Sequence, residues 1–329
     1  MKAIVYTQYG SPDVLQLKEI EKPTPKDDEV LIKVMAASAN PLDWHMMRGE
    51  PFLVRLDGGL RKPKHTQLGA DVAGWIEAVG RNVTEFKVGD AVFGDISGAD
   101  LGSFAEYVCS KPETLALKPA NISFEEAAAT PVVGFTAIQG LRDKGKIQSG
   151  QHVLINGASG GVGSFAVQYA KAMGAEVTGV CSTRNLEMVR SLGADHVLDY
   201  TKEDFTRTGQ RYDLIYDAVG NCSVGDYQRA LTPNGIASVA GLTTLPLLFQ
   251  VMIWGSLVSK FSSQDIGLMK TAQANKKDLL IIKDLLESGK VKPVIDKSYP
   301  LSETADAIRY LETMRARGKV IIHVASANA

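Results

Sequence analysis

The feature that most constrains this chain is a glycine-rich turn at residues 156–163, which reads NGASGGVG. It follows an apolar strand and opens a helix over residues 162–173, so the free N–H groups at the start of that helix can bind a pyrophosphate. Gly157 permits the tight turn, Gly160 lets the backbone approach the phosphates, and Gly163 allows the helix to pack closely on the strand. The glycine spacing alone also fits a glycine-rich turn that binds no ligand, but its position between a strand and a helix predicts a dinucleotide-binding site.

The distribution of strands and helices predicts two domains, which agrees with a length of 329 residues. Residues 1–122 consist of short strands with almost no helical periodicity, a pattern typical of a partly open β-barrel. Ser123 forms a capping box with Glu126, and beyond it short apolar strands alternate with helices. This alternation predicts an α/β fold with a doubly wound parallel sheet. We therefore expect a dinucleotide-binding domain at residues 123–264 and a catalytic domain at residues 1–122 plus 265–329.

The choice of cofactor depends on the end of the second strand of the predicted sheet, where NAD-binding chains place a carboxylate. Here the chain reads VCSTRN at residues 180–185, which supplies hydroxyls and a cation but no acid. Ser182, Thr183 and Arg184 are suitable donors to a 2′-phosphate, so the sequence predicts NADPH/NADP+. The alternative for Arg184 is a solvated arginine at the start of a helix.

Charge and cysteine content exclude several other classes of protein. The formal net charge is −1, so no nucleic-acid partner is expected. The three cysteines form no C-x-x-C pair, which suits a reducing compartment, and we predict a cytoplasmic location. The apolar stretch at residues 245–258 is too short and interrupted to be a transmembrane segment. Residues 242–261 are nevertheless unusually apolar, which predicts a pocket wall or dimer contact, with peripheral membrane contact as the alternative.

Short segments along nearly the whole chain match one protein superfamily in the same order. They are GSPDVL at residues 10–15, ANPLDW at 39–44, GADVAGWIEAVG at 69–80, VGDAVFG at 88–94, the GASGGVG loop, YD-x-VG at 216–220 and GKVII at 318–322. With these segments the chain resembles the zinc-free medium-chain dehydrogenase/reductase superfamily, in its quinone oxidoreductase and enone (alkenal) reductase branch. The resemblance implies a Rossmann NADP-binding domain, a GroES-like β-barrel domain and a homodimer joined edge to edge near a strand at residues 256–261.

The resemblance also implies that the chain has no metal site. Zinc-dependent relatives place a cysteine where this chain has Asn40 and a histidine where it has Ala70. Their third ligand would fall near residues 132–133, and their structural zinc lobe would need four cysteines near residues 95–103. Since catalytic zinc needs about three protein ligands, no metal is expected here.

The glycine loop and the resemblance together predict which residues line the cofactor. The predicted cofactor-binding residues are Asn40, Gly157, Ser159, Gly160, Gly161, Val162, Gly163, Ser182, Thr183, Arg184, Tyr200, Val219, Gly241, Leu242 and Lys319. Candidate catalytic donors to a substrate oxygen are Asn40, Thr136 and the backbone at residues 242–244, although each of them also suits a structural role. No general acid stands out, and solvent could deliver the final proton.

The expected chemistry follows from the missing zinc ligands. Without a Lewis acid a plain alcohol is poorly activated, whereas the carbonyl of a conjugated enone or a quinone withdraws charge itself. We therefore predict an NADPH-dependent oxidoreductase that transfers hydride to the activated C=C of a small enone or alkenal, or to a quinone. The alternatives are an NADPH-dependent aldehyde or ketone reductase of the same fold and a non-catalytic NADPH-binding protein.

Overall fold

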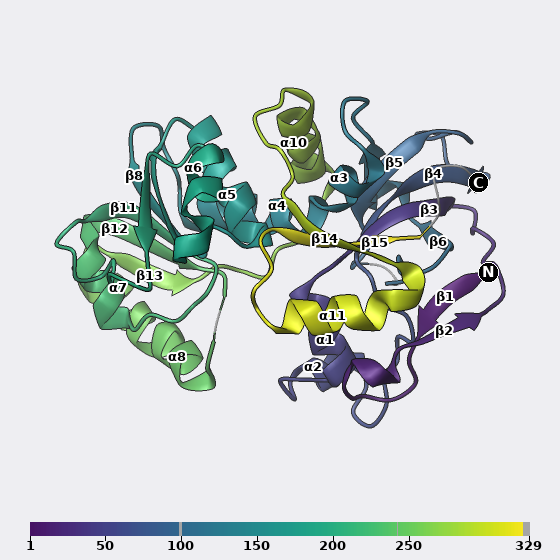
Figure 1. Ribbon diagram of the computed structural model, residues 1–329, viewed down its shortest axis with the longest axis horizontal. Coiled ribbons are helices and arrows are strands. Elements are labelled where there is room, and N and C mark those ends of the chain that lie inside the picture. The colour runs from purple at the N-terminus through teal and green to yellow at the C-terminus, as the bar shows by residue number, and fades with distance from the viewer. Residues whose placement is uncertain (99–100, 242, 325–329) are drawn as a thin grey trace. The chain divides into compact units, whose positions relative to one another are not determined.

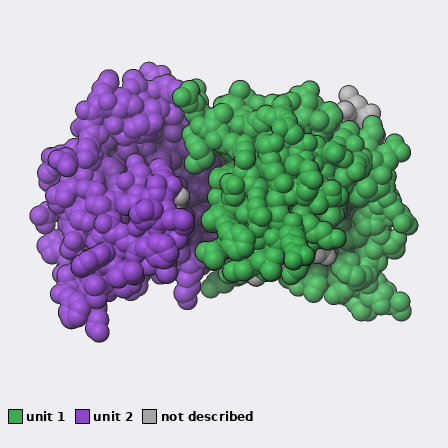
Figure 2. Space-filling model, turned by 90° about the horizontal axis from the view of Figure 1, so that it is seen from below, with its two compact units in different colours: residues 1–132, 273–289, 293–329 green, residues 133–272, 290–292 purple. Residues whose placement is uncertain are grey.

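The computed structural model of the chain describes residues 1–98, 101–241 and 243–324, and it divides into two compact units (Figures 1 and 2). Unit 1 comprises Met1–Val132, Gln273–Gly289 and Pro293–Ala329, and unit 2 comprises Val133–Ala272 and Lys290–Lys292.

Unit 2 contains the predicted doubly wound sheet. Its six strands are all parallel and lie in the order β10-β9-β8-β11-β12-β13. The strands are β8 (His152–Asn156), β9 (Glu176–Cys181), β10 (His196–Asp199), β11 (Tyr212–Asp217), β12 (Leu231–Val239) and β13 (Asp265–Leu268). Numbered along the chain this is the order 3-2-1-4-5-6 of a dinucleotide-binding fold, in which the direction of winding reverses between the first and fourth strands. Here these two strands are β8 and β11, so a ligand site is expected where they end.

Four helices of unit 2 pack on this sheet because its strands are apolar on both faces. They are α5 (Gly161–Ala172), α6 (Leu186–Ser191), α7 (Val224–Ala230) and α9 (Ser256–Phe261). Helix α8 (Leu245–Gln250) has no buried residue and contacts the π-helical turn Val251–Gly255, and another π-helical turn spans Gly140–Lys144. Strand residues such as Leu154 and Ile215 are fully buried in a core that also includes Tyr227 of α7.

Unit 1 is built on a seven-stranded sheet with the order β14-β15-β3-β4-β5-β7, to which β6 adds by pairing with β3. The strands are β3 (Val30–Ala39), β4 (Asp71–Val79), β5 (Ala91–Asp95), β6 (Tyr107–Ser110), β7 (Leu115–Leu117), β14 (Ile295–Pro300) and β15 (Lys319–His323). A separate hairpin pairs β1 (Lys2–Val5) with β2 (Gln16–Glu19). All pairs in unit 1 are antiparallel except β14 with β15.

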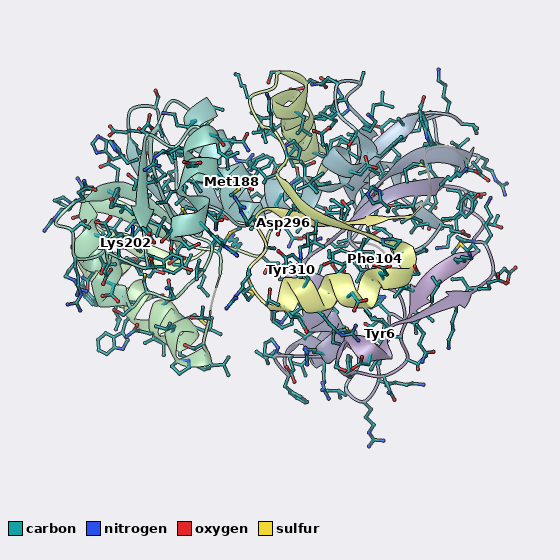
Figure 3. The ribbon with its side chains drawn as sticks, in the orientation of Figure 1. Tyr6, Phe104, Met188, Lys202, Asp296 and Tyr310 are labelled. Atoms are coloured by element: carbon teal, nitrogen blue, oxygen red, sulfur yellow. The ribbon has the colours of Figure 1, made fainter. Side chains whose placement is uncertain are left out.

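The helices of unit 1 are α1 (Pro41–Arg48), α2 (Val54–Gly58), α3 (Phe124–Ala128), α10 (Lys276–Glu287) and α11 (Thr304–Glu312), and α4 (Pro131–Gln139) runs from unit 1 into unit 2. Tyr6 and Phe104, labelled in Figure 3, are buried in the core beside α1 and α11. The hydroxyl of Tyr310 on α11 donates to Asp296 Oδ2 on β14 at 2.6 Å, which ties that helix to the sheet (Figure 3).

The main stretch of unit 2, Val133–Ala272, begins and ends about ten residues later than the predicted domain at residues 123–264, and Lys290–Lys292 also belong to unit 2. The capping box at Ser123 is present, but the short helix that it opens, α3, packs on β3 and β4 of unit 1. Pro131 then begins a separate helix, because proline is tolerated at a helix start but not in its interior. The predicted strand near residues 256–261 is wrong, because that segment is helix α9, and the strand that follows it, β13, forms one edge of the sheet.

Candidate active site

The glycine loop joins β8 to α5 in unit 2 with the geometry that its sequence predicts. Gly157 has φ +81°, a left-handed conformation that favours glycine. A Cβ at Gly163 would lie 2.0 Å from the carbonyl oxygen of Gly157, so any side chain there would force α5 off the strand. Both glycines are therefore required by the fold itself. Helix α5 begins at Gly161 with Gly160 as its N-cap, and the first N–H groups of such a helix have no acceptor within it.

Gly160 differs from Gly157 and Gly163 because nothing in the fold requires a glycine at its position. Its backbone is extended, with φ −80° and ψ 176°. A Cβ at this position would meet only the carbonyl oxygen of Gly157, at an ordinary 3.6 Å. Glycine loses more conformational entropy on folding than any other residue, so the fold alone favours a larger residue here. The missing side chain leaves an open cradle at the start of α5, which suits a phosphate group.

The turn after β9 lies against this loop through a buried asparagine. Asn185 Nδ2 donates to Ser159 Oγ at 2.9 Å and to Ser182 Oγ at 3.2 Å, so two predicted cofactor residues share one partner. Asn185 Oδ1 is buried and has no hydrogen-bond donor among the described residues. A bound hydroxyl or a water molecule would satisfy this oxygen. The structure therefore brings the glycine loop and the β9 turn into one polar surface.

The other predicted residues of this region fall into two groups. Arg184 and Tyr200 are both exposed and follow the adjacent strands β9 and β10. The hydroxyl of Thr183, by contrast, donates to Asp199 Oδ2 at 2.5 Å. This hydrogen bond is the largest cause that holds the pKa of Asp199 below its usual value. The Thr183 proton is thus engaged within the protein, so Thr183 is a poorer donor to a 2′-phosphate than its position in the sequence indicates.

Asp217, at the end of β11, holds the turn that follows this strand through hydrogen bonds, a role that the sequence analysis did not predict. Its Oδ1 accepts from Asn156 Nδ2 at 2.9 Å and from the backbone N–H groups of Val219 and Gly220, each at 2.8 Å. Its Oδ2 accepts from the hydroxyl of Tyr227 at 2.8 Å. Burial raises the pKa of this carboxyl, while the hydrogen bonds oppose the rise. Asp217 therefore fixes the backbone on which Val219 lies.

The remaining predicted residues of unit 2 have mainly backbone roles. A Cβ at Gly241 would lie 2.2 Å from the carbonyl oxygen of Ala218, so this close approach needs glycine. Thr136 is half-buried on α4, and its carbonyl oxygen accepts from the hydroxyl of Tyr216 at 3.1 Å. Leu242 lies outside the described residues.

In unit 1 two predicted residues, Asn40 and Lys319, are directly hydrogen-bonded although they are far apart in sequence. Lys319 Nζ donates to Asn40 Oδ1 at 2.5 Å and to Asp71 Oδ2 at 3.1 Å. Asn40 Nδ2 donates to Asp71 Oδ2 at 2.9 Å and to the carbonyl oxygen of Ser38 at 3.2 Å. The side chains of Lys319 and Asp71 are only 6% and 0% exposed. Both amide hydrogens of Asn40 are therefore engaged, whereas Lys319 has a third hydrogen for which no acceptor lies among the described residues.

Two further buried carboxyls lie near this pair, and no sequence signal distinguished them from ordinary surface acids. Asp43 is fully buried, and it accepts from the backbone N–H groups of Asn40 at 2.7 Å and Gly69 at 2.9 Å. Burial outweighs these bonds and raises its pKa to about 7. Burial likewise raises the pKa of Asp95 to about 6, aided by the charge of Asp71. Lys319 acts on both carboxyls in the opposite direction, as the nearby positive charge.

The described residues offer no evident metal site, since they contain no group of three or more His, Cys, Asp or Glu arranged to hold an ion. Asn40 and Ala70, at two positions where zinc-dependent relatives carry ligands, are both buried. Within the same described ranges, no helix is both long enough and apolar enough to cross a membrane.

Comparisons with known proteins agree with this geometry. A family described as the alcohol dehydrogenase GroES-like domain matches residues 26–120, and one described as zinc-binding dehydrogenase matches residues 192–322. Over 98% of its length the chain is 39% identical to the 2-methylene-furan-3-one reductase of Solanum lycopersicum. Over the same share of its length it is 37% identical to the NADPH-dependent alkenal/one oxidoreductase, chloroplastic, of Arabidopsis thaliana. Each alignment covers 79% of the relative.

Among solved structures, the quinone oxidoreductase from Coxiella burnetii is similar over 99% of both chains, with a TM-score of 0.85 and 31% identity. The predicted combination of a GroES-like domain with a Rossmann domain is thereby confirmed, as is the resemblance that the sequence motifs indicated.

Proposed function

This chain belongs to the quinone and alkenal oxidoreductases of the medium-chain dehydrogenase/reductase superfamily, and on that premise we propose that it reduces the activated double bond of a small enone or alkenal, or a quinone, with NADPH and without a metal ion. The observation that carries the proposal is the cradle at Gly160, where the helix N-terminus is open and the fold itself needs no glycine.

The choice of NADPH over NADH rests on the β9 turn. Residues 182–185 contain no carboxylate that could accept from a ribose 2′-hydroxyl. Arg184 is exposed, and Ser182 shares the Asn185 partner with Ser159 of the glycine loop. A 2′-phosphate at this turn would find a cation and a hydroxyl donor, which are the groups that bind such an anion.

The bound cofactor supplies a hydride, and the chain's own residues bind and orient the reactants. The N–H groups at the start of α5 hold the pyrophosphate, and Asp217 keeps the turn at Val219 in place. Lys319 is the better donor to a substrate oxygen than Asn40, because its third hydrogen is available while both amide hydrogens of Asn40 are engaged. Asn40 then acts by orienting the ammonium group, which stabilises the developing enolate. A role for Thr136 as a second donor stays a prediction.

The preference for conjugated acceptors follows from the missing Lewis acid. An enone delocalises the incoming charge onto its own oxygen, where one hydrogen-bond donor suffices. A saturated aldehyde lacks this delocalisation and depends more strongly on a metal ion or a proton donor.

The test is to measure NADPH oxidation with pairs of acceptors that share one carbon skeleton, an enone and its saturated ketone, together with a quinone series. The protein is first treated exhaustively with a chelator, and the assay is repeated with NADH. We expect turnover of enones or quinones that survives chelation and is faster with NADPH. Activity on the saturated ketones alone would indicate a carbonyl reductase instead, and activity lost on chelation and restored by zinc would refute the metal-free proposal. Tight NADPH binding without turnover of any acceptor would indicate a non-catalytic binding protein.

A homodimer and a cytoplasmic location also stay predictions. The edge strand of unit 2 next to the predicted segment is β13 rather than residues 256–261 themselves. Sedimentation of the purified protein at several concentrations would decide the oligomeric state.

A further inference from the structure

A helical segment of unit 2, residues 245–261, carries seven large apolar side chains that are exposed. It consists of α8, the π-helical turn Val251–Gly255 and α9, which follow one another without a break. Large apolar side chains between 41% and 78% exposed cover its outer side, and we call them the apolar face. They are Leu245, Phe249, Met252, Ile253, Trp254, Leu257 and Phe261. Soluble proteins seldom expose so many neighbouring large apolar side chains without a binding role.

The spacing of these residues shows why they share one side of the segment. Most of the steps between them are three or four residues, which is the period of a helix. The opposite side is anchored to the sheet, because Val251 is 1% exposed in the core of unit 2. A Cβ on Gly255 would lie 2.6 Å from the carbonyl oxygen of Ile266 on β13. The segment therefore cannot rotate to bury its apolar face against its own sheet.

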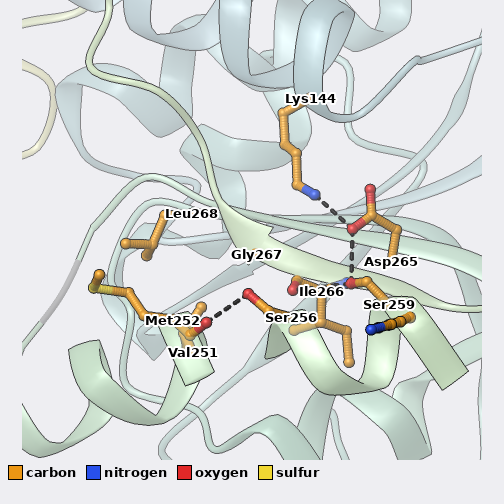
Figure 4. A pocket seen from close by; sticks show the side chains of 10 residues that line it. Lys144, Val251, Met252, Ser256, Ser259, Asp265, Ile266, Gly267 and Leu268 are labelled. Carbon is orange, nitrogen blue, oxygen red and sulfur yellow. Dashed lines mark hydrogen bonds and ion pairs between the residues drawn. The ribbon is translucent and has the colours of Figure 1, made fainter. Parts of the chain in front are cut away.

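Charge is distributed around the apolar face rather than on it. Residues 241–264 contain a single charged side chain, Lys260, and no acid. A groove of about 560 Å³ runs between the segment and β13, lined by Lys144 and Lys260 together with Asp265 (Figure 4). Lys144 Nζ lies 2.7 Å from Asp265 Oδ1, and Lys146 also acts electrostatically on that carboxyl. Two lysines and one aspartate line the groove, and Lys146 lies close enough to act on that aspartate, so these four side chains together carry a net positive charge.

We propose that the apolar face docks on an anionic lipid bilayer surface, with the lysine-rich groove against the headgroups. An interfacial helix characteristically combines large apolar and aromatic side chains on one side with nearby cations, and tryptophan is enriched at the membrane–water boundary. The lysines would add attraction to anionic lipids, which falls with ionic strength. The surface suits contact with a bilayer rather than insertion across it, since no described helix is long enough to span one. This docking concerns where the enzyme acts and does not depend on its acceptor.

The test is flotation of the full-length protein with vesicles of phosphatidylcholine alone and with vesicles that contain phosphatidylserine. The variant is Phe249→Ser/Trp254→Ser/Phe261→Ser, which removes three aromatic side chains of the apolar face. The matched control is Val88→Ser/Leu117→Ser/Leu280→Ser, which removes apolar side chains that are 43% to 61% exposed on unit 1. Both variants are checked by circular dichroism and by NADPH binding, so a folding defect is recognised. Mass in solution is measured by analytical ultracentrifugation.

We expect the wild type and the control to float with the phosphatidylserine vesicles, more weakly at high salt. The face variant should lose binding by about tenfold or more, because it removes three of the seven large apolar side chains that would drive interfacial partitioning. Absence of binding by the wild type, or equal binding by the face variant, would overturn the proposal. A face variant whose mass in solution falls relative to the wild type would also overturn it, because the apolar face would then be a contact between two copies of the chain. If the face variant is misfolded, the single substitution Phe261→Ser, at the most exposed position, decides by the same criteria.

Discussion

The buried carboxyl of Asp43 should make the stability of unit 1 depend on pH in an unusual direction. Its pKa is raised by burial from an ordinary 3.8 to about 7, so the folded protein holds this proton more tightly than the unfolded chain does. A group of this kind stabilises the fold fully below its unfolded pKa, and the stabilisation is lost as the pH rises through the folded pKa. The contribution of Asp43 to the free energy of unfolding should therefore fall between about pH 4 and pH 7.

The magnitude follows from the two pKa values. The difference between 3.8 and about 7 corresponds to about 4 kcal/mol, at 1.36 kcal/mol for each pH unit. No discount for solvent screening is needed, because Asp43 is fully buried. Asp95, with a pKa raised to about 6, adds a smaller contribution of the same sign. The variant Asp43→Asn removes the larger of the two titrations and keeps the size of the side chain.

The assay is urea unfolding followed by tryptophan fluorescence, in a Trp254→Phe background. Of the three tryptophans, Trp44 and Trp75 then remain, and both lie in unit 1, so the signal reports that unit alone. Trp254 is 61% exposed, and its replacement should cost little stability. Other titrating groups are common to both proteins, so they cancel in the difference between the background protein and its Asp43→Asn derivative.

We expect the stability of the background protein, measured relative to its Asp43→Asn derivative, to fall by about 3 kcal/mol between about pH 4.5 and pH 8, with equal m-values. This range covers most of the titration and avoids the strongly acidic conditions in which other carboxyls are protonated. Val88→Ser, at a side chain that is 61% exposed on unit 1, removes no titrating group, so it is the control and should show a constant difference. If the difference for Asp43→Asn changes by less than about 1 kcal/mol over this range, the burial argument is refuted.

Three further predictions concern the two polar sites. Gly160→Ala should leave the melting temperature nearly unchanged and should weaken NADPH binding, measured by calorimetry. Gly163→Ala should lower both the melting temperature and the affinity for NADPH, because its Cβ would lie 2.0 Å from a backbone carbonyl oxygen. Arg184→Ala should raise the dissociation constant for NADPH by about tenfold or more and change that for NADH much less, because NADH has no 2′-phosphate for the guanidinium to bind; an equal effect on both cofactors would contradict the assignment. Lys319→Met should destabilise unit 1 by about 3–5 kcal/mol in urea unfolding, because it leaves the buried Asp71 carboxylate without its cation, and Asp71→Asn in the same chain should recover most of that loss.

The dinucleotide-binding fold was predictable because its signal is local. An apolar strand, a glycine turn and a helix start follow one another within about twenty residues, and each places its own requirement on the chain. The segment at residues 256–261 misled the prediction for the same reason. Its residues, SLVSKF, suit a strand as well as a helix, and in the fold they continue the helical turn that ends at Gly255, which packs closely against Ile266. Tertiary contacts of this kind leave no trace in local periodicity.

The polar cluster of unit 1 could not be predicted, because its members come from distant strands. Asn40 and Lys319 were each predicted from motifs, but their hydrogen bond depends on the pairing of β3 with β15. Asp71 begins β4, on the other side of β3, and meets both residues only in the folded sheet. The sequence shows that these residues are present, but it does not show that they meet. Their hydrogen bonds form only because the order of the strands brings them together.

The structure shows that the glycines of the loop are there for two different reasons, the fold and the bound ligand. Gly157 is needed for a positive φ and Gly163 for close packing, so both would be glycine even in a protein that bound nothing. Gly160 has an ordinary extended backbone and room for a side chain, and the fold gains nothing from its flexibility. The entropy that glycine costs at this position is offset only when another molecule occupies the space that a side chain would fill. Gly160 is therefore the residue of the loop that argues most directly for a bound phosphate.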